Sequence, residues 1–131
     1  MQTAQKLAQK NLEVLESGQY DVIVTDCSSC ASFLKKYPVL FPEDDDRGTA
    51  AKSFSTKIRD MIEWLDHETV PMPATDSPVR VTYHDPCHAA RGQGIMKQPR
   101  ELLQKLPGIE YVELPEADWC CGGAGAYALS Q

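Results

Sequence analysis

Five cysteines, arranged in three groups, constrain this chain of 131 residues more than any other feature. Cys27 and Cys30 form a CxxC pair, Cys87 stands alone in YHDPCH, and Cys120 and Cys121 are adjacent in WCCGGAG. Adjacent cysteines rarely bridge each other, because the geometry of such a disulfide is strained. The odd number of thiols therefore favours a metal, cluster or redox site over a set of structural disulfides.

The composition is that of one ordinary globular domain. Hydrophobic residues make up 42% and charged residues 24% of the chain, which argues against disorder and fibrous repeats. The formal net charge of -6 argues against non-specific nucleic-acid binding, which needs clustered positive charge. The N-terminal stretch lacks the apolar segment of a secretory signal, and no apolar run is long enough to span a bilayer. We therefore expect a cytoplasmic, reducing location, where cysteines are typically metal ligands or redox groups.

Alternating strand and helix patterns predict an α/β domain. The apolar run VIV predicts a strand near residues 21–25 that is buried on both faces. VRVTY predicts a second strand near 79–83, and a third is expected near 109–114. An amphipathic stripe predicts a helix over 49–66. Strands separated by helices indicate a small three-layer domain with a mainly parallel sheet and crossover helices.

Each group of cysteines follows the end of a predicted strand. Cys27 comes after the first strand, Cys87 after the second, and Cys120 and Cys121 after the third. In a parallel sheet the carboxyl ends of the strands lie at one edge, where ligands bind. The spacing therefore predicts that all of the thiols line the same edge of the sheet.

Several thiolates at one edge would select soft or borderline metals, namely iron–sulfur clusters, zinc or copper(I). The glycines of CCGGAG leave backbone N–H groups free to approach sulfur, and such hydrogen bonds tune a reduction potential. His84 and His88 flank Cys87 and are additional candidate ligands, although a structural hydrogen-bonding role is the ordinary one for histidine. The chemistry of this edge is therefore predicted to be that of a metal or cluster site.

Other functions stay open on the residues alone. A CxxC pair on a strand-to-helix turn is also typical of a thioredoxin-like dithiol, in which Cys27 and Cys30 would exchange a disulfide. The remaining three cysteines, with one of the two histidines, could instead hold a structural zinc ion. A module that only docks a partner protein is a further alternative.

Two stretches resemble a known family. HDPCHAARGQGIMKQPRELLQKLPGIEYVELPEADWCCGGAGAYALSQ resembles the cysteine-rich CCG domain, which occurs in the iron-sulfur subunit of glycolate oxidase, in lactate utilisation protein A and in heterodisulfide reductase. The upstream stretch DVIVTDCSSCASFLKKYPVLF resembles the segment that closes the preceding repeat in the same proteins. The CCGGAG turn, preceded by PRELL and LPEADW, is most like that of the glycolate oxidase iron-sulfur subunit.

The resemblance implies a ligand role for every cysteine. In that family each repeat carries a single cysteine, then the CC pair, then a CxxC. Cys87, Cys120 and Cys121 match the first three positions of a second repeat, and Cys27 and Cys30 match the closing CxxC of a first repeat. The implied cofactor is an iron–sulfur cluster of the 4Fe-4S type, with zinc as the alternative.

The resemblance also implies how the single α/β domain over 1–131 is organised. Residues 1–40 would be the end of a first CCG-type repeat, residues 41–78 a helix and linker, and residues 79–131 the truncated start of a second repeat. The family's remaining cysteines and its ferredoxin-like module fall outside the sequence. The chain is therefore expected to be a fragment that spans parts of two repeats.

The function implied by the resemblance is electron transfer rather than catalysis. A flavoprotein subunit would oxidise a 2-hydroxy acid such as glycolate or lactate, and the iron–sulfur subunit would pass the electrons towards a quinone or another acceptor. The expected location is cytoplasmic, or peripheral on the inner face of the cytoplasmic membrane as part of that complex. No nucleic-acid partner and no transmembrane segment are expected.

Overall fold

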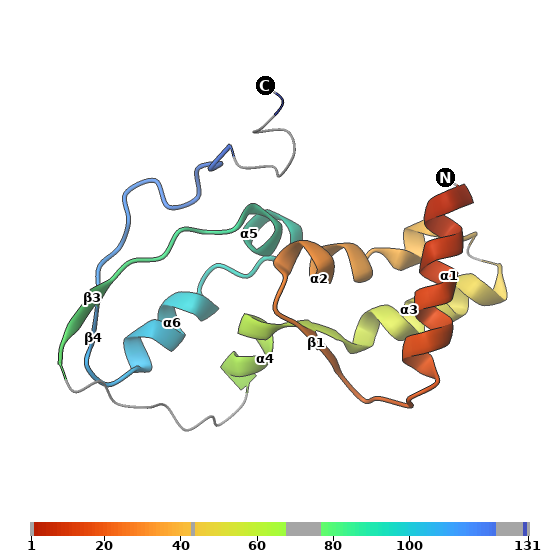
Figure 1. The fold of residues 1–131 in the computed structure, drawn as a ribbon, viewed down its shortest axis with the longest axis horizontal. Coiled ribbons are helices and arrows are strands. Elements are labelled where there is room, and N and C mark those ends of the chain that lie inside the picture. The colour runs from red at the N-terminus through yellow and green to blue at the C-terminus, as the bar shows by residue number, and fades with distance from the viewer. Residues whose placement is uncertain (1, 43, 68–76, 123–129, 131) are drawn as a thin grey trace. The chain divides into compact units, whose positions relative to one another are not determined.

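The computed structural model describes residues 2–42, 44–67, 77–122 and 130. The chain forms two compact units, residues 1–68 and residues 69–131, each with its own set of elements (Figure 1). The first unit contains α1 (Gln2–Glu16), β1 (Ile23–Thr25), α2 (Ser28–Leu34), the 3-10 helix η1 (Tyr37–Leu40), α3 (Asp46–Lys57), β2 (Ile58–Asp60) and α4 (Met61–His67). The second contains β3 (Val79–Val81), α5 (Cys87–Gln93), α6 (Gln98–Lys105) and β4 (Ile109–Tyr111).

The first unit packs its helices around an apolar core beside a two-stranded parallel sheet. β1 and β2 pair in parallel, with Ile23 opposite Ile58. The ring of Tyr37 stacks on that of Phe54 at a centroid distance of 5.7 Å, and α1 lies beside α3 (Figure 1). The buried core residues come from the helices, from β2 and from the residue that follows η1: Ala8, Leu12, Ala31, Tyr37, Phe41, Ala51, Phe54 and Ile58.

The helix predicted over 49–66 is wrong in its middle. α3 ends at Lys57, and β2 follows it before α4 begins at Met61. Ile58 and Asp60 are buried while Arg59 between them is only partly covered, which is the alternation of a strand. Pairing with β1 therefore overrides the helical periodicity of the apolar stripe, because Ile58 is buried completely in the strand conformation.

A capping motif starts α4 afresh after this strand. The Asp60 carboxylate accepts a hydrogen bond from the Ile62 N–H at 3.1 Å, and the Asp60 N–H donates to the Glu63 carboxylate at 3.3 Å. This reciprocal pattern is a capping box, and D-x-x-E is its sequence signal. The new helix start was therefore visible in the sequence, although the apolar stripe runs straight through it.

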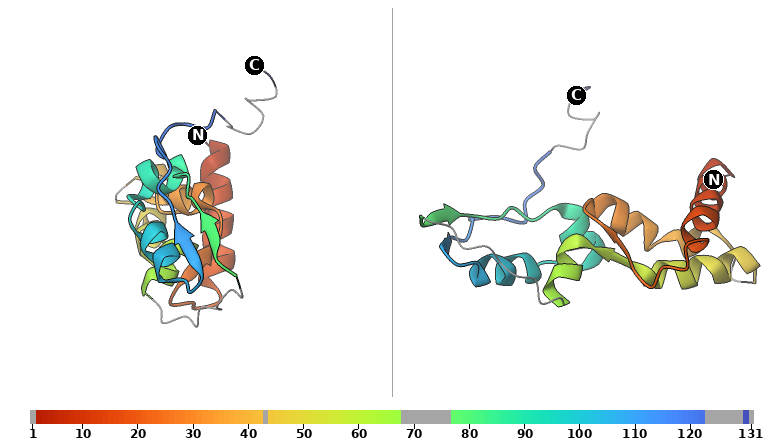
Figure 2. Two further views of the ribbon diagram at one scale, coloured as in Figure 1. Left: turned by 90° about the vertical axis from the view of Figure 1, so that its left-hand side faces the viewer. Right: turned by 60° about the horizontal axis from the view of Figure 1, so that its bottom comes forward.

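The second unit is a parallel βαβ arrangement. β3 and β4 lie side by side, with Val79 opposite Ile109, and α6 runs along β4 (Figure 2). Gly94 ends α5 in the left-handed conformation at φ +75°, and its N–H donates to the carbonyl of Ala90 at 3.0 Å. The buried hydrophobic residues of this unit are mostly small: Ala89, Ala90, Ile95, Leu102 and Ala117.

The α/β class and the parallel pairing predicted from the sequence are confirmed, but the predicted single sheet is not observed. The described strands form two separate two-stranded sheets, because the strand inside the predicted 21–25 range pairs with β2, and those inside 79–83 and 109–114 pair with each other. The three-layer arrangement and the division into 1–40, 41–78 and 79–131 stay predictions.

The first strand is also less buried than the sequence suggests. Val24 on β1 is 37% exposed, while Ile23 and Thr25 are partly covered. A two-stranded sheet meets the core with one face, so an apolar run in it is not enclosed on both. None of the helices in the described ranges is both long and apolar enough to cross a membrane.

Candidate functional site

The CxxC pair lies on the turn between β1 and α2. Cys27 is the N-cap residue of α2, and its backbone N–H donates to the Thr25 hydroxyl at 3.2 Å. The Cys27 carbonyl accepts from the Ala31 N–H at 2.9 Å, which closes the first turn of the helix. Ala31 is fully buried in the core, so both cysteines are left on the exposed side of the turn.

Hydrogen bonding inside this turn makes the two thiols unequal. The Cys27 sulfur accepts hydrogen bonds from the backbone N–H and then from the thiol of Cys30, and these bonds lower the pKa of Cys27. The same hydrogen bond to Cys27, followed by repulsion from its charge, raises the pKa of Cys30. Cys27 is therefore the more acidic thiol of the pair, and Cys30 is its hydrogen-bond donor.

The lone cysteine begins the first helix of the second unit. Cys87 is the first residue of α5 and is exposed, with its sulfur 3.6 Å from Nδ1 of His88. Just before it stands Asp85, which is 3% exposed. A carboxylate this deeply buried needs a charged partner, and Arg100 supplies one.

Hydrogen bonds tie the segment around Cys87 to the segment before Cys120. They reach consecutive carbonyls: the Asp85 N–H donates to Ala117 at 2.8 Å, the Arg91 guanidinium to Asp118 at 3.1 Å, and the His84 ring to Trp119 at 2.9 Å. Because a carbonyl only accepts, Nε2 of His84 is the donor, which leaves Nδ1 as the ring nitrogen that could bind a metal. The segment that immediately precedes the CC pair is therefore held against the segment that leads into Cys87.

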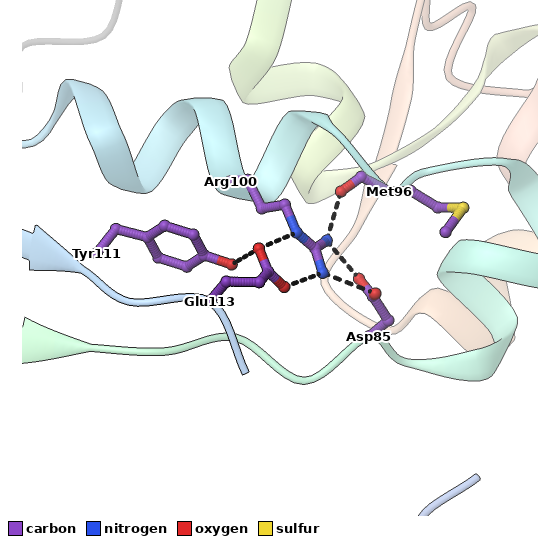
Figure 3. A network of polar contacts seen from close by, with 5 residues as sticks. All are labelled: Asp85, Met96, Arg100, Tyr111 and Glu113. Atoms are coloured by element: carbon purple, nitrogen blue, oxygen red, sulfur yellow. Dashed lines mark hydrogen bonds and ion pairs between the residues drawn. The ribbon is translucent and has the colours of Figure 1, made fainter. Parts of the chain in front are cut away.

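Arg100 lies at the centre of this arrangement (Figure 3). Its guanidinium holds the Asp85 carboxylate with two bonds of 2.8 and 2.9 Å, and the Glu113 carboxylate with two of 2.9 and 2.8 Å. The last N–H donates to the Met96 carbonyl at 2.7 Å, and the Tyr111 hydroxyl donates to Glu113 at 2.7 Å. The hydrogen bonds from Arg100 and then Tyr111 lower the pKa of Glu113 to about 2.

The five predicted ligands are all free, exposed thiols. The structure brings Cys27 and Cys30 together, and it links the segments that carry Cys87 and the CC pair. Within the part of the chain that the structure describes, no three His, Cys, Asp or Glu side chains are grouped so that they could hold a metal ion. Soft thiolate donors fit an iron–sulfur cluster or zinc in kind, and a common site for them stays a prediction.

Among the glycines after the CC pair, Gly122 has φ +70° with open space around it. Gly123 and Gly125 lie outside the described residues. Gly122 therefore turns the backbone directly after Cys121 in a conformation that other residues rarely adopt.

The sequence reasoning missed Arg100, Asp85 and Glu113 as functional candidates. They stand inside or beside the stretches HDPCH, PRELL and LPEADW that carry the resemblance, but nothing in their local patterns shows that they pair. Arg100 is 15 residues from Asp85 and 13 from Glu113, so only the tertiary structure shows the contact.

Comparison with known proteins gives consistent matches along the chain. The family model for the cysteine-rich domain CCG matches residues 1–35 and 81–131. The probable glycolate oxidase iron-sulfur subunit of Bacillus subtilis is 33% identical over 130 residues, which covers 97% of this chain and 29% of that protein. Among solved structures, none matches significantly.

Two further relatives carry other names. A subunit of the fumarate reductase (CoM/CoB) of Methanothermobacter marburgensis is 37% identical over 120 residues, covering 91% of this chain and 22% of that protein. Lactate utilization protein A of Oceanobacillus iheyensis is 32% identical over 130 residues, covering 98% of this chain and 52% of that protein. The chain thus spans between about a fifth and a half of the length of these relatives.

Proposed function

Because the chain belongs to the cysteine-rich CCG domain family, we propose that it is part of an iron–sulfur-binding, electron-transfer subunit of a flavin-dependent 2-hydroxy-acid oxidoreductase. The observation that carries this proposal is the similarity over nearly the whole chain to a glycolate oxidase iron-sulfur subunit, combined with five thiols that are free and exposed. Thiols that are not held in disulfides are available as metal ligands once they lose their protons.

The ligands in this proposal are Cys87, Cys120 and Cys121 for one partial site, and Cys27 and Cys30 for another. An iron–sulfur cluster of the 4Fe-4S type would supply one-electron oxidation and reduction. The chain's own residues present the sulfurs: α2 begins at the CxxC turn and α5 at the lone cysteine. His84 and His88 are secondary candidates, and His84 could ligate only through Nδ1 while Nε2 donates to the Trp119 carbonyl.

The partners follow from the same proposal. A flavoprotein subunit would deliver electrons taken from a hydroxy acid such as glycolate or lactate, and a quinone-type acceptor would receive them. The protein would work in the cytoplasm, or on the inner face of the cytoplasmic membrane as part of the complex. This chain would carry no substrate chemistry of its own.

Elemental analysis tests the cofactor. Protein prepared anaerobically is expected to contain iron and acid-labile sulfide and to absorb broadly in the visible range. Cys120→Ser and Cys121→Ser should each lower that absorption, whereas Trp119→Phe, an exposed neighbour without a ligand atom, should not. Zinc without sulfide would select the structural zinc alternative, and an unchanged spectrum in both cysteine variants would contradict the ligand assignment.

The CxxC geometry favours a dithiol exchange function as the second candidate. The sulfur of Cys27 accepts hydrogen bonds from the backbone and the thiol of Cys30, on an exposed strand-to-helix turn. In metal-free protein at neutral pH, iodoacetamide should then modify Cys27 faster than Cys30, because its lower pKa leaves more thiolate. Turnover in an insulin-reduction assay that is lost in both Cys27→Ser and Cys30→Ser would support this function, and no turnover would eliminate it.

A further inference from the structure

Arg100 contacts the segments that follow both strands of the second unit, and it does so from a helix that lies between these strands in the sequence. It lies in α6, while Asp85 follows β3 and Glu113 follows β4 (Figure 3). Every N–H of its guanidinium group is used: two on Asp85, two on Glu113 and one on the Met96 carbonyl. A planar fork of this kind fixes two carboxylates in distance and in angle, which a lysine ammonium cannot do.

On one side the fork holds the chain that leads into Cys87. The side chain of Asp85 is 2% exposed, so its carboxylate depends on Arg100 for a partner. The ring of Tyr83 lies under the guanidinium at 5.9 Å, which adds a second contact on the same segment. Pro86 follows, and α5 begins directly at Cys87. Little freedom is left between the clamped carboxylate and the thiol.

On the other side the fork holds the chain that leads to the CC pair. Glu113 is bound by Arg100 and by the Tyr111 hydroxyl. Beyond it, the Trp119 N–H closes a turn on the Glu116 carbonyl at 3.0 Å, immediately before Cys120. The backbone N–H of Asp85 donates to the Ala117 carbonyl within this turn at 2.8 Å, which links the two segments directly.

We propose that Arg100 is a positioning residue: it holds the segment that carries Cys87 beside the segment that leads to Cys120 and Cys121. A metal could then gather these three thiols, which are not grouped as a metal site in the described part of the chain, and Arg100 would set their affinity for it. The inference rests on the proposed function for the identity of the ligands. Arg100 touches no sulfur; it acts by clamping Asp85 and Glu113, from which the two cysteine-bearing segments continue. Groups that orient metal ligands in this way govern metal affinity even though they make no bond to the metal.

Cobalt(II) is the probe. The intensity of its thiolate charge-transfer absorption reports how many sulfur ligands it has, and titration gives its dissociation constant. The experiment uses the full chain with Cys27→Ser and Cys30→Ser, so that Cys87, Cys120 and Cys121 are the only thiols. Arg100→Lys is compared with Arg80→Lys, the same change in an exposed ion pair whose Arg80 and Glu110 atoms lie 3.3 Å apart. Titrations are run anaerobically, well below the thermal midpoint of each variant.

The expected result is that Arg100→Lys weakens Co²⁺ binding by about tenfold or more, the usual cost of removing a group that orients metal ligands. Arg80→Lys should leave the affinity unchanged. A lower thermal midpoint with unchanged affinity would show that Arg100 serves stability alone and would overturn the proposal. Absence of thiolate–cobalt absorption in the parent protein would overturn it too.

A second variant covers the case in which Arg100→Lys does not give the native far-UV spectrum. Glu113→Gln removes one ionic partner of the fork and leaves Asp85 paired, so it is expected to fold and to weaken Co²⁺ binding by a smaller factor. Unchanged affinity in Glu113→Gln would then overturn the proposal.

The two proposals fail separately. If the parent chain takes up no iron and sulfide but binds cobalt with an affinity that depends on Arg100, the iron–sulfur function fails and the positioning role stands. If the chain takes up iron and sulfide but its cobalt affinity is unchanged in Arg100→Lys, the positioning role fails and the proposed function stands.

Discussion

The two units place their cysteines by different kinds of interaction. In the first, the CxxC turn is anchored by apolar packing, because α2 buries Ala31 in a core that contains Tyr37, Phe41 and Phe54. In the second, the buried hydrophobic residues are mostly small, and the segments that carry the cysteines are joined by the Arg100 fork and by hydrogen bonds to three successive carbonyls.

The difference matters because apolar burial and hydrogen bonding constrain geometry unequally. The free energy gained by apolar packing is roughly proportional to the buried area, and it does not depend on direction. Charge-assisted hydrogen bonds, in contrast, fix both the distance and the angle between their partners. A CxxC pair brings its own spacing through the helical turn it starts, so packing suffices to hold it. Cys87 and the CC pair are far apart in sequence and depend on directional contacts.

The largest expected effect is in the apolar unit. Phe54→Ala removes a fully buried ring and should destabilise the first unit by about 3–5 kcal/mol. Hydrogen exchange followed by mass spectrometry should show faster exchange in residues 2–67 and little change in residues 77–122. Val39→Ala, at a residue that is 78% exposed, is the control and should be nearly neutral. Equal acceleration in both units would break the comparison.

The second effect belongs to the polar unit. Arg100→Gln leaves the Asp85 carboxylate buried without its cation, and we expect a loss of about 3 kcal/mol, as for other broken buried pairs. Hydrogen exchange should be faster in residues 77–122, with little change in residues 2–67. Arg80→Gln is the matched control, because its pair with Glu110 is exposed and should contribute less than about 1 kcal/mol. If the two variants had the same stability in urea, the second unit would not depend on its charge network.

A smaller effect is expected at the start of α4. Asp60→Ala removes the acceptor for the Ile62 N–H and should cost about 1 kcal/mol, the usual loss for an N-cap residue. Asp60→Asn keeps an oxygen in the same place and should cost less. Urea unfolding monitored by circular dichroism distinguishes the two, and an equal loss in both would mean that the charge of Asp60, rather than the cap, stabilises the first unit.

The smallest effect is the pH dependence that Glu113 adds to the second unit. The folded-state pKa of about 2 lies below the ordinary value of 4.5, so the folded state favours the ionised form. The contribution is therefore fully present above pH 4.5 and is lost as the pH falls towards 2. Glu113→Gln should be less stable than the parent at pH 7 and should lose less stability on acidification. Parallel stability curves across this window would contradict the assignment.

Much of the fold was predictable from local patterns, and the exceptions have a physical cause. The strand near 21–25 was predicted from an apolar run and that near 79–83 from its strand pattern, and a third was expected near 109–114. Parallel pairing was predicted from the intervening helices. The strand at Ile58–Asp60 was missed because its apolar residue also fits a helical stripe. Its pairing with β1 depends on a partner more than 30 residues away in the sequence, which no local pattern contains.

The sequence by itself determined the chemistry of this protein: which side chains are thiols, how they are spaced, and that the chain belongs to the CCG family. These properties depend on residue identity and order, so they can be read without coordinates. Only the tertiary structure decided which strands pair and that Arg100 joins Asp85 to Glu113. Both kinds of contact join residues far apart along the chain. The contact between Arg100 and Asp85 forms because a buried carboxylate needs a cation within reach once the chain has folded.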